Sequence, residues 1–372
     1  MLYRSALHKA LAGCRPAALL LLAALGWSSV AAAQGAAQGE ASGSDEKPAR
    51  LFDVESALPV TMTAPWGEIE SNEDEQGPYP ATIEYRDPNG ETVKLAMTVE
   101  RRGKKRQEAC SFPPIRLRFE KEAVKGTAFR GQNSLKMVTH CAKSDRYDQF
   151  YVLEMLIYRM YNRLSEYSFR VRPLQVEYVD SDDGDVFDQR FAFLIEDDSD
   201  VAKRNGLKKI DIGQLPIGQL EPQAGALMAL FQYMIGNADW AALSGPDPSE
   251  CCHNVKLVGP EPLQPGDLAV PVPYDFDSAG LVDADYAFPN PALGIKSVTQ
   301  RVYRGYCANN VALEAARQAL FDHEAAFVAL VENESRLSAG SKKKAIRYLG
   351  KYFDIARDSG KFERFVIERC RK

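Results

Sequence analysis

Hydrophobic and polar residues alternate over several short stretches in the first half of the chain, a pattern typical of strands with one buried face. The clearest example is a hairpin over residues 81–86 and 93–100, because Asp87-Pro-Asn-Gly90 between them is a strong turn signal. The same alternation predicts four further strands, at residues 115–119, 134–138, 171–179 and 187–195.

Other stretches follow the period of helices. Residues 147–164 place five apolar side chains at helical spacing without Gly or Pro, and residues 224–235 form a second, more apolar helix. Past Asp197 helices dominate, and the last ones are predicted near residues 311–337, 342–355 and 362–369. This order predicts an α+β fold with two lobes, a sheet-rich N-terminal lobe over residues 51–197 and a helical C-terminal lobe over residues 198–372.

The first 33 residues have the pattern of a signal peptide. Arg4, Lys9 and Arg15 precede or flank a short apolar run, and Ala31-Ala32-Ala33 provides a cleavage site. The run is too short for a transmembrane helix, which needs about 20 apolar residues. We therefore expect residues 1–33 to be removed on export to the periplasm or the extracellular space, with residues 34–50 as a disordered, Ala/Gly/Ser-rich linker.

Charge narrows the range of partners. Without the three basic residues of the signal peptide, 43 Lys and Arg remain against 51 Asp and Glu, a net charge of −8. A non-specific nucleic-acid binder would usually be basic, so we expect no nucleic-acid partner. No transmembrane segment is expected in the mature chain either.

Cysteine usage indicates disulfides. Six cysteines follow the predicted cleavage site: Cys110, Cys141, Cys251, Cys252, Cys307 and Cys370. An even number in an exported chain favours disulfides over a metal site or free thiols, and the sequence has no C-x-x-C and only four histidines. We predict that Cys110 pairs with Cys141. Because adjacent cysteines rarely bond each other, Cys251 and Cys252 are expected to pair separately with Cys307 and Cys370.

The densest chemical signal is a spaced set of polar residues near the middle of the chain. Asp239 follows the helix at 224–235, Asn254 opens a short strand-like run, and an Asp-Phe-Asp, Asp275 to Asp277, closes a second one. Phosphoryl transfer needs a carboxylate to position the acceptor and an Asn and an Asp to hold Mg²⁺ against nucleotide phosphates. The order therefore predicts Asp239 as the catalytic residue and Asn254, Asp275 and Asp277 as metal ligands.

Each of these residues also has a purely structural interpretation. Asp239 would simply cap the chain after a helix, Asn254 would be a turn residue before a strand, and Asp275 with Asp277 would form a solvated acidic turn. His253, beside paired cysteines, is interpreted as a structural histidine rather than a ligand.

The ordered set of motifs resembles the protein-kinase-like superfamily, most closely the exported spore-coat CotH kinases and more distantly the HipA-like kinases. Arg101-Arg102-Gly103 precedes the Pro-containing strand at residues 112–119, as in the CotH pattern. The resemblance implies a two-lobed protein-kinase-like fold that uses ATP and Mg²⁺. It further implies that Lys136 binds phosphate with Glu154 as its partner, and that Glu196 ends the hinge strand of the nucleotide site.

The chain also departs from the common kinase pattern. Asp239 and Asn254 lie 15 residues apart, no G-x-G-x-x-G is present, and Asp277 stands where kinases have Gly. The leading hypothesis is an exported atypical kinase that transfers a phosphoryl group from ATP to a protein or small-molecule hydroxyl. The alternatives are a catalytically silent kinase-like binding or envelope-assembly module, and a glycosidase that uses Asp239 and Asp275 as paired carboxylates.

Overall fold

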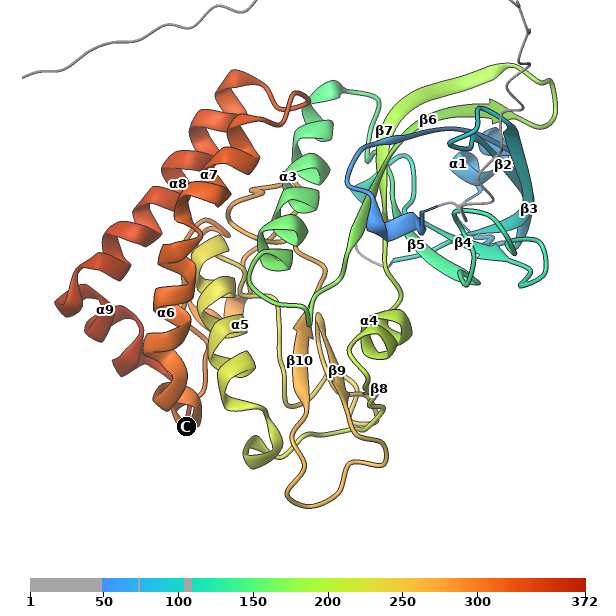
Figure 1. The fold of residues 1–372 in the computed structure, drawn as a ribbon. Coiled ribbons are helices and arrows are strands. Elements are labelled where there is room, and N and C mark those ends of the chain that lie inside the picture. The colour runs from blue at the N-terminus through green and yellow to red at the C-terminus, as the bar shows by residue number, and fades with distance from the viewer. Residues whose placement is uncertain (1–48, 73, 104–108) are drawn as a thin grey trace, which may run out of the picture. The chain divides into compact units, whose positions relative to one another are not determined.

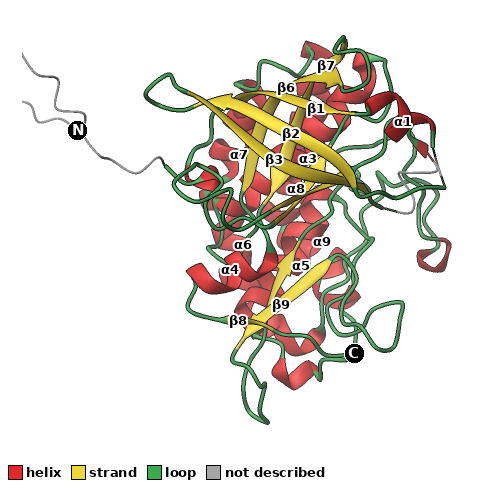
Figure 2. Cartoon of the chain, turned by 90° about the vertical axis from the view of Figure 1, so that its right-hand side faces the viewer, coloured by secondary structure: helices red, strands yellow, loops and turns green. Residues whose placement is uncertain are grey.

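Seven strands close into a mixed β-barrel in the computed structural model, which describes residues 49–72, 74–103 and 109–372 (Figures 1 and 2). The order around the barrel is β1-β2-β3-β4-β5-β7-β6. The strands are β1 (Leu58–Ala64), β2 (Tyr79–Arg86), β3 (Thr92–Arg101), β4 (Ile115–Phe119), β5 (Ser134–Val138), β6 (Val171–Asp180) and β7 (Val186–Ile195).

The alternation read from the sequence sets which side chains fill the barrel. In β2 and β5 every second residue is buried, so that Leu135 and Met137 point inward while Lys136 lies on the outer face. The barrel core is aromatic at its centre, where Trp66 meets Tyr178 edge-on with ring centroids 5.0 Å apart. The β2–β3 hairpin closes as predicted through Asp87, whose carboxylate accepts the backbone N–H of Glu91.

The prediction of a two-lobed protein-kinase-like fold is wrong, because the N-terminal part is a closed barrel. The strand that closes it, β1, was not predicted from the sequence. It pairs antiparallel with β2 and parallel with β6, where Leu58 lies opposite Leu174. A parallel pairing between strands so far apart leaves no local sequence signal. The coarser prediction of an α+β fold agrees with the structure.

A second, small sheet and a set of helices make up the rest of the described chain. The sheet has the order β10-β9-β8 and contains β8 (Lys208–Lys209), β9 (Val255–Gly259) and β10 (Val270–Pro273). The helices are α1 (Trp66–Ser71), α3 (Asp145–Asn162), α4 (Asp198–Arg204), α5 (Pro222–Ile235), α6 (Leu313–Asp322), α7 (Glu324–Glu332), α8 (Ala339–Arg357) and α9 (Ser359–Phe365). Short 3₁₀ turns cover Leu51–Asp53, Ile217–Gln219, Pro291–Leu293, Cys307–Ala312 and Ile367–Arg369.

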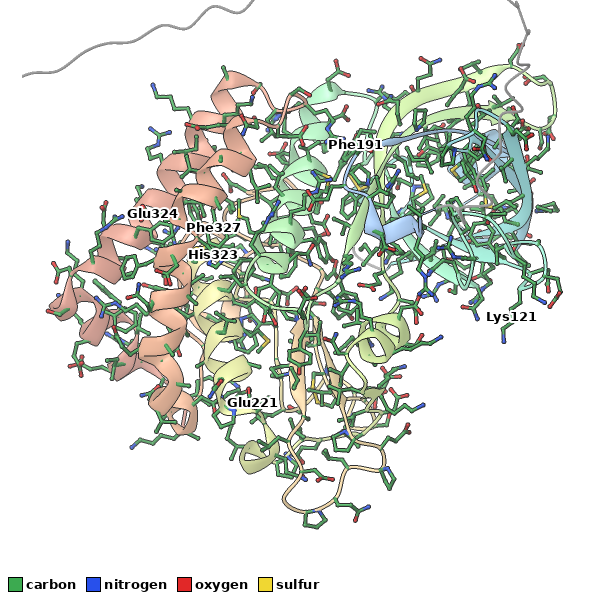
Figure 3. All side chains as sticks on the ribbon, in the orientation of Figure 1. Lys121, Phe191, Glu221, His323, Glu324 and Phe327 are labelled. Atoms are coloured by element: carbon green, nitrogen blue, oxygen red, sulfur yellow. A yellow bond between two sulfur atoms is a disulfide. The ribbon has the colours of Figure 1, made fainter. Side chains whose placement is uncertain are left out.

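Helix α3 lies between the barrel and the C-terminal helices (Figure 1). On its barrel side, Tyr151 stacks on Phe191 of β7 with ring centroids 5.7 Å apart. Phe191 in turn has the guanidinium of Arg336 over its ring at 4.2 Å (Figure 3). Helix α3 is buried on nearly all sides and belongs to a second hydrophobic core. This core runs from α3 through α5 to α8 and is separate from the barrel core.

Helix α5 is bounded by clear start and stop signals. Glu221 caps its N-terminus by accepting the N–H of Ala224, and Pro222 occupies the first helical position (Figure 3). Gly236 ends the helix in the left-handed conformation with φ of 70°. This sharp stop turns the chain so that Asn237 to Asp239 leave the helix directly toward the candidate site.

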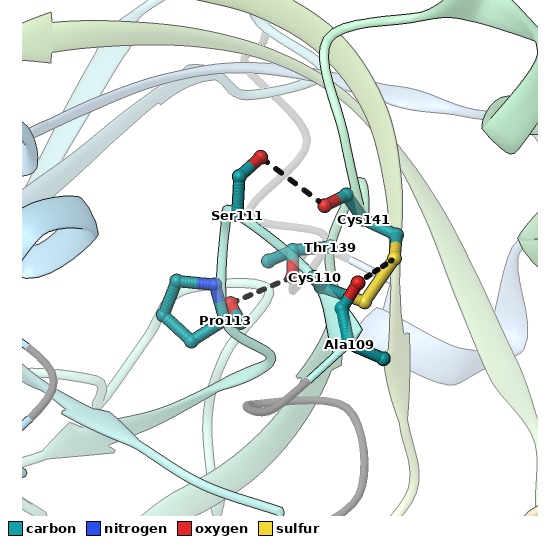
Figure 4. The surroundings of a disulfide bond; sticks show 6 residues. All are labelled: Ala109, Cys110, Ser111, Pro113, Thr139 and Cys141. Carbon is teal, nitrogen blue, oxygen red and sulfur yellow. Dashed lines mark hydrogen bonds between the residues drawn. A yellow bond between two sulfur atoms is a disulfide. The ribbon is translucent and has the colours of Figure 1, made fainter. Parts of the chain in front are cut away.

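Three disulfides are present among the described residues, and one of the predicted pairings is confirmed. Cys110 bonds Cys141, beside hydrogen bonds from Ser111 to the Cys141 carbonyl and from Thr139 to the Pro113 carbonyl (Figure 4). The pairing predicted for the other four cysteines is wrong. Cys251 bonds its neighbour Cys252, and Cys307 bonds Cys370 because a parallel bridge between the preceding Tyr306 and the following Arg371 brings them together.

The predicted signal peptide, residues 1–33, and most of the linker at 34–50 lie outside the described residues. Both stay predictions, as do the domain boundaries at 51–197 and 198–372. In the part of the chain that the structure describes, no helix is both long and apolar enough to cross a bilayer.

Candidate functional site

The backbone brings Asp239, Asn254 and Asp275 together at one end of the β9–β10 sheet. Ala241 and His253 exchange two N–H···O=C bonds of 2.9 and 3.0 Å, which holds the segment after α5 beside the start of β9. The N–H of Tyr274 donates to the carbonyl of Asn254 at 3.1 Å and so extends the β9–β10 ladder. The residues between 241 and 253 are therefore a loop with paired ends, which accounts for the long Asp239–Asn254 spacing.

Two side chains, those of His253 and Asn254, hold Asp239 in place. Its Oδ1 lies 2.8 Å from Nε2 of His253, and the side-chain amide of Asn254 donates to the Asp239 carbonyl at 2.7 Å. Asn237 accepts the backbone N–H of Asp239 at 3.0 Å. The Asp239 side chain is still 25% exposed, so the carboxylate is oriented by the fold and also reachable from solvent.

His253 is a residue that sequence reasoning assigned to a structural role only. It contacts the candidate catalytic carboxylate directly, with a side chain that is 33% exposed. This contact of Nε2 with the carboxylate fixes the rotamer of Asp239. The position of His253 next to Asn254 was the only signal in the sequence that could have pointed to a role in the site. Its contact with Asp239 depends on the Ala241–His253 bridge and therefore on the fold.

Asp275 is held in an unusual backbone conformation. Its φ is 62° and that of Asn254 is 51°, and only one other non-glycine residue of the described chain, Asp283, has positive φ. Such conformations cost about 1–2 kcal/mol for most residues, less for Asn and Asp, and cluster at functional sites. The N–H of Asp275 donates to the hydroxyl of Tyr158 on α3 at 2.9 Å.

The neighbours of Asp275 in the Asp-Phe-Asp segment have different surroundings. Phe276 is fully buried and packs edge-on against Tyr158 with ring centroids 4.8 Å apart, which anchors the segment in the core. Asp277 is partly buried and accepts a hydrogen bond from the Ser278 hydroxyl at 3.3 Å. The buried Phe between two more accessible carboxylates keeps both near the end of β10.

Lys136 reaches this site from the barrel. Its Nζ lies 4.6 Å from the centroid of the Tyr274 ring, directly before Asp275 in the chain. The pKa of Lys136 is lowered to about 8, chiefly by burial and also by the nearby charges of Arg102 and Lys256. Asp275 acts in the opposite direction, so its carboxylate is close enough to influence the amine. The structure thus brings Lys136, Asp239, Asn254 and Asp275 to one place.

Glu154 is in α3, one helical turn before Tyr158, and is almost fully buried. Its negative charge, together with that of Asp275, adds to the effect of burial in raising the pKa of Tyr158. The predicted partnership of Glu154 with Lys136 stays a prediction. Glu154 lies behind the site, next to the tyrosine that anchors Asp275.

Glu196 is placed by the fold in a different set of contacts. Its buried carboxylate accepts hydrogen bonds from Nε of Arg204 and from the backbone N–H of Arg170, both at 3.0 Å. Burial raises the pKa of Glu196, and the bond to Arg204 opposes that effect. This side chain therefore fastens the end of β7 to α4, and its predicted role in cofactor binding stays a prediction.

A pocket of about 250 Å³ opens beside Asp239. Its floor contains Asp239, Gly236 and Ser278, and its walls come from the loop after the Asp-Phe-Asp segment. The apolar wall residues are Phe288, Pro289, Pro291, Ile295 and Val298. A small group that enters this pocket would meet one carboxylate, the polar side chains of Ser278 and Asn290, and an apolar wall.

The predicted metal ligands, Asn254, Asp275 and Asp277, fit Mg²⁺ only as a partial set. Within the described residues no group of three or more His, Cys, Asp or Glu is arranged to hold a metal. Two carboxylates and an amide oxygen nevertheless suit Mg²⁺, which commonly takes one or two protein carboxylates and completes its shell with water and substrate phosphates. The residues present therefore fit a metal that arrives with a phosphorylated ligand.

No family model matches the chain, and no curated protein matches it in sequence. The resemblance to the CotH kinases consequently rests on the motifs themselves. Function must be argued from the site, since neither the fold nor a relative supplies it.

Proposed function

We propose that this protein is an exported phosphotransferase that transfers a phosphoryl group from ATP, with Mg²⁺, to a hydroxyl of a protein or small molecule. The observation that carries the proposal is the meeting of Lys136, from the barrel, with Tyr274 and Asp275 at the end of β10. A lysine and a carboxylate on facing elements are the minimum needed to hold a phosphate and its metal.

Each residue has a defined task in this proposal. Lys136 binds phosphate oxygens with its amine, and Asp275 with Asn254 and Asp277 would hold Mg²⁺. When bound, the metal would offset charge on the transferred group. Asp239 orients an acceptor hydroxyl that enters from the neighbouring pocket and accepts its proton.

His253 is a positioning residue in the same scheme. It holds one oxygen of Asp239 at 2.8 Å, and the backbone and amide contacts described above hold the rest of that residue. A carboxylate fixed in this way loses little freedom when the acceptor binds, which is how positioning lowers a reaction barrier.

The same hydrogen bond favours a second candidate, a catalytically silent binding module. Because Oδ1 of Asp239 is already engaged by His253, that oxygen is less available to a substrate hydroxyl. The site would then bind a nucleotide without transferring its phosphate. The two candidates share the phosphate and metal residues and differ only in what Asp239 does.

Export to the periplasm or the extracellular space is also part of the proposal. It is supported by the three disulfides, which persist mainly in oxidising compartments, and by the pattern of residues 1–33.

Nucleotide-dependent melting combined with two substitutions tests the proposal. A phosphotransferase predicts that Mg²⁺ and ATP raise the melting temperature of the wild type through mass action. Asp275→Asn should lose this stabilisation, whereas Asp239→Asn should keep it and lose only turnover, measured as ATP consumption with candidate acceptors. Asp354→Asn, on the exposed face of α8, is the matched control and should behave as wild type.

The outcomes separate the candidates. Nucleotide stabilisation without turnover in the wild type favours the silent binding module. A wild type that gains no stability from ATP and Mg²⁺ refutes both, and equal nucleotide affinity in the wild type and Asp275→Asn refutes the metal role of Asp275.

A further inference from the structure

Two lysines from different elements face one aromatic ring at the candidate site. Lys136 of β5 has its Nζ 4.6 Å from the centroid of Tyr274, and Lys256 of β9 has its Nζ 5.7 Å from the same centroid. Lys256 lies two residues after Asn254 and opposite Val272 of β10. Both amines are within the distance at which a cation is attracted by the electrons of the ring.

The two lysines are not in close ion pairs with the carboxylates of the described residues. Among the described residues, no carboxylate oxygen lies within 4 Å of the amine of Lys136 or Lys256. Asp198, which acts on Lys136 from α4, is itself 3.7 Å from the amine of Lys209. Arg102 adds a third positive charge that acts on both Lys136 and Tyr274.

The ring of Tyr274 is the group that both amines share. Tyr274 is partly buried, and its uncharged aromatic ring lies against both amines. A neutral ring orients the ammonium groups without neutralising them, as a carboxylate would. Two ammonium groups beside one ring suit an anion that carries more than one negative charge.

We propose that Lys256 is a second phosphate-binding residue, and that Lys136 and Lys256 together bind two consecutive phosphates of a nucleoside di- or triphosphate across Tyr274. This inference rests on the proposed function and makes it more specific. A single phosphate meets one amine, whereas a polyphosphate chain that follows the ring meets both. The site therefore selects ligands by the number of linked phosphates.

A simpler role for Lys256 is to cover Tyr274 with its aliphatic stem while its amine stays in water. This alternative predicts that the stem matters and the charge does not. Lys256→Met keeps a stem of similar length and removes the charge, and Lys256→Gln removes the charge and shortens the side chain. The two variants together distinguish the roles even if one of them folds poorly.

The test is calorimetric titration of the full mature chain with ATP and ADP, each with Mg²⁺, and with inorganic tripolyphosphate, AMP and orthophosphate. We expect both Lys256 variants to lower the affinity for ATP, ADP and tripolyphosphate about tenfold, the effect of losing one hydrogen bond to a charged group. Affinity for AMP and orthophosphate should change much less. Lys208→Gln, an exposed lysine on the neighbouring strand β8, is the matched control and should leave all affinities unchanged.

The result that overturns the inference is a Lys256→Met variant that binds ATP and tripolyphosphate as tightly as Lys208→Gln does. If Lys136→Gln loses ATP binding in the same experiment, the proposed function stands and only the second lysine is refuted. If the wild type itself binds neither ATP nor tripolyphosphate, the proposed function fails together with this inference.

Discussion

Two basic residues, Lys136 within β5 and His140 just after it, meet opposite surroundings. Lys136, within the strand, lies on the outer face of the barrel against Tyr274, whereas His140, two residues past its end, packs onto the aromatic core with its ring stacked on Phe112 at 4.3 Å. Burial is the first cause of a lowered pKa in both, to about 8 for Lys136 and about 4 for His140. The same physical effect therefore leaves one residue mostly charged at neutral pH and the other neutral.

The difference lies in what surrounds each cation. Asp188 is 3.8 Å from His140, but its carboxylate is shared with Arg190, which approaches it at 3.0 Å. Lys136 has other cations nearby and the carboxylate of Asp275 at the opening of a site. A buried basic residue is thus a candidate for binding only where a ligand, rather than the fold, would supply the missing negative charge.

Removing the Cys110–Cys141 disulfide should have the largest effect on stability, while it leaves the Lys136 side of the comparison intact. Cys141 directly follows His140, and the disulfide closes a loop with a sequence separation of 31 residues. Cys110→Ala with Cys141→Ala should lower the free energy of unfolding by about 3–4 kcal/mol, measured by urea denaturation. Nucleotide binding by the folded fraction should persist, because the disulfide lies next to His140 and not next to Lys136. Loss of nucleotide binding in a variant that is still folded would show that the surroundings of His140 and the site at Lys136 are coupled.

His140, but not Lys136, should make stability depend on pH between 4 and 6.5. Because its folded pKa of about 4 is below the ordinary value of 6.5, the unfolded state binds more protons between these values. Stability should therefore fall as the pH drops from 6.5 to 4, by up to roughly 3 kcal/mol. Asp188, Arg190 and Lys143 are the charged groups that act on this imidazole.

Comparison of variants isolates that contribution from other titrating groups. Denaturation of wild type and His140→Gln at pH 7 and pH 4.5 should show a smaller fall in the variant, and Lys136→Met should show the same fall as the wild type. An equal fall in wild type and His140→Gln would contradict a neutral, buried His140.

The smallest expected effect is on the stability of Lys136→Met. The folded pKa of Lys136 is about 8, whereas the ordinary value is 10.5, so folding disfavours the charged amine. The resulting loss of stability is complete below pH 8 and shrinks as the pH rises to 10.5. The variant should therefore be more stable than the wild type at pH 7, by roughly 1–2 kcal/mol. The gap should narrow at pH 9.5 in urea denaturation. A variant that is less stable at pH 7 would mean that Lys136 serves the fold as an ion-pair partner.

The sequence predicted the elements whose signals are local. The bounds predicted for β4 and β5 are those observed, and α3 and α5 were located to within a few residues. Strand β1 was missed because its closing partner, β6, is remote in the sequence. The bond between Cys251 and Cys252 was rejected on general grounds, and only the structure revealed it.

Some residues of the candidate site could likewise be found from local sequence signals, and others only from the fold. Asp239, Asn254 and Asp275 were selected by residue type and order, and strand pairing brings them together. His253 and Lys256 were not selected, because their significance depends on which residues lie across from them. His253 needs the bridge to Ala241 to reach Asp239, and Lys256 needs the β9–β10 register to reach Tyr274. Local pattern identifies chemical groups, whereas the tertiary pairing decides which of them act together.

The parallel pairing of β1 with β6 also affects the order in which the barrel can be completed. Thr61 and Glu177, which share a hydrogen bond across that seam, are separated by 116 residues. A ribosome or an export channel therefore releases β1 long before its second neighbour, and until then one edge of the sheet stays open to pairing with other chains. Completion of the barrel is consequently a late, non-local step that slows folding, and a chain that stops short of β6 would keep an aggregation-prone edge.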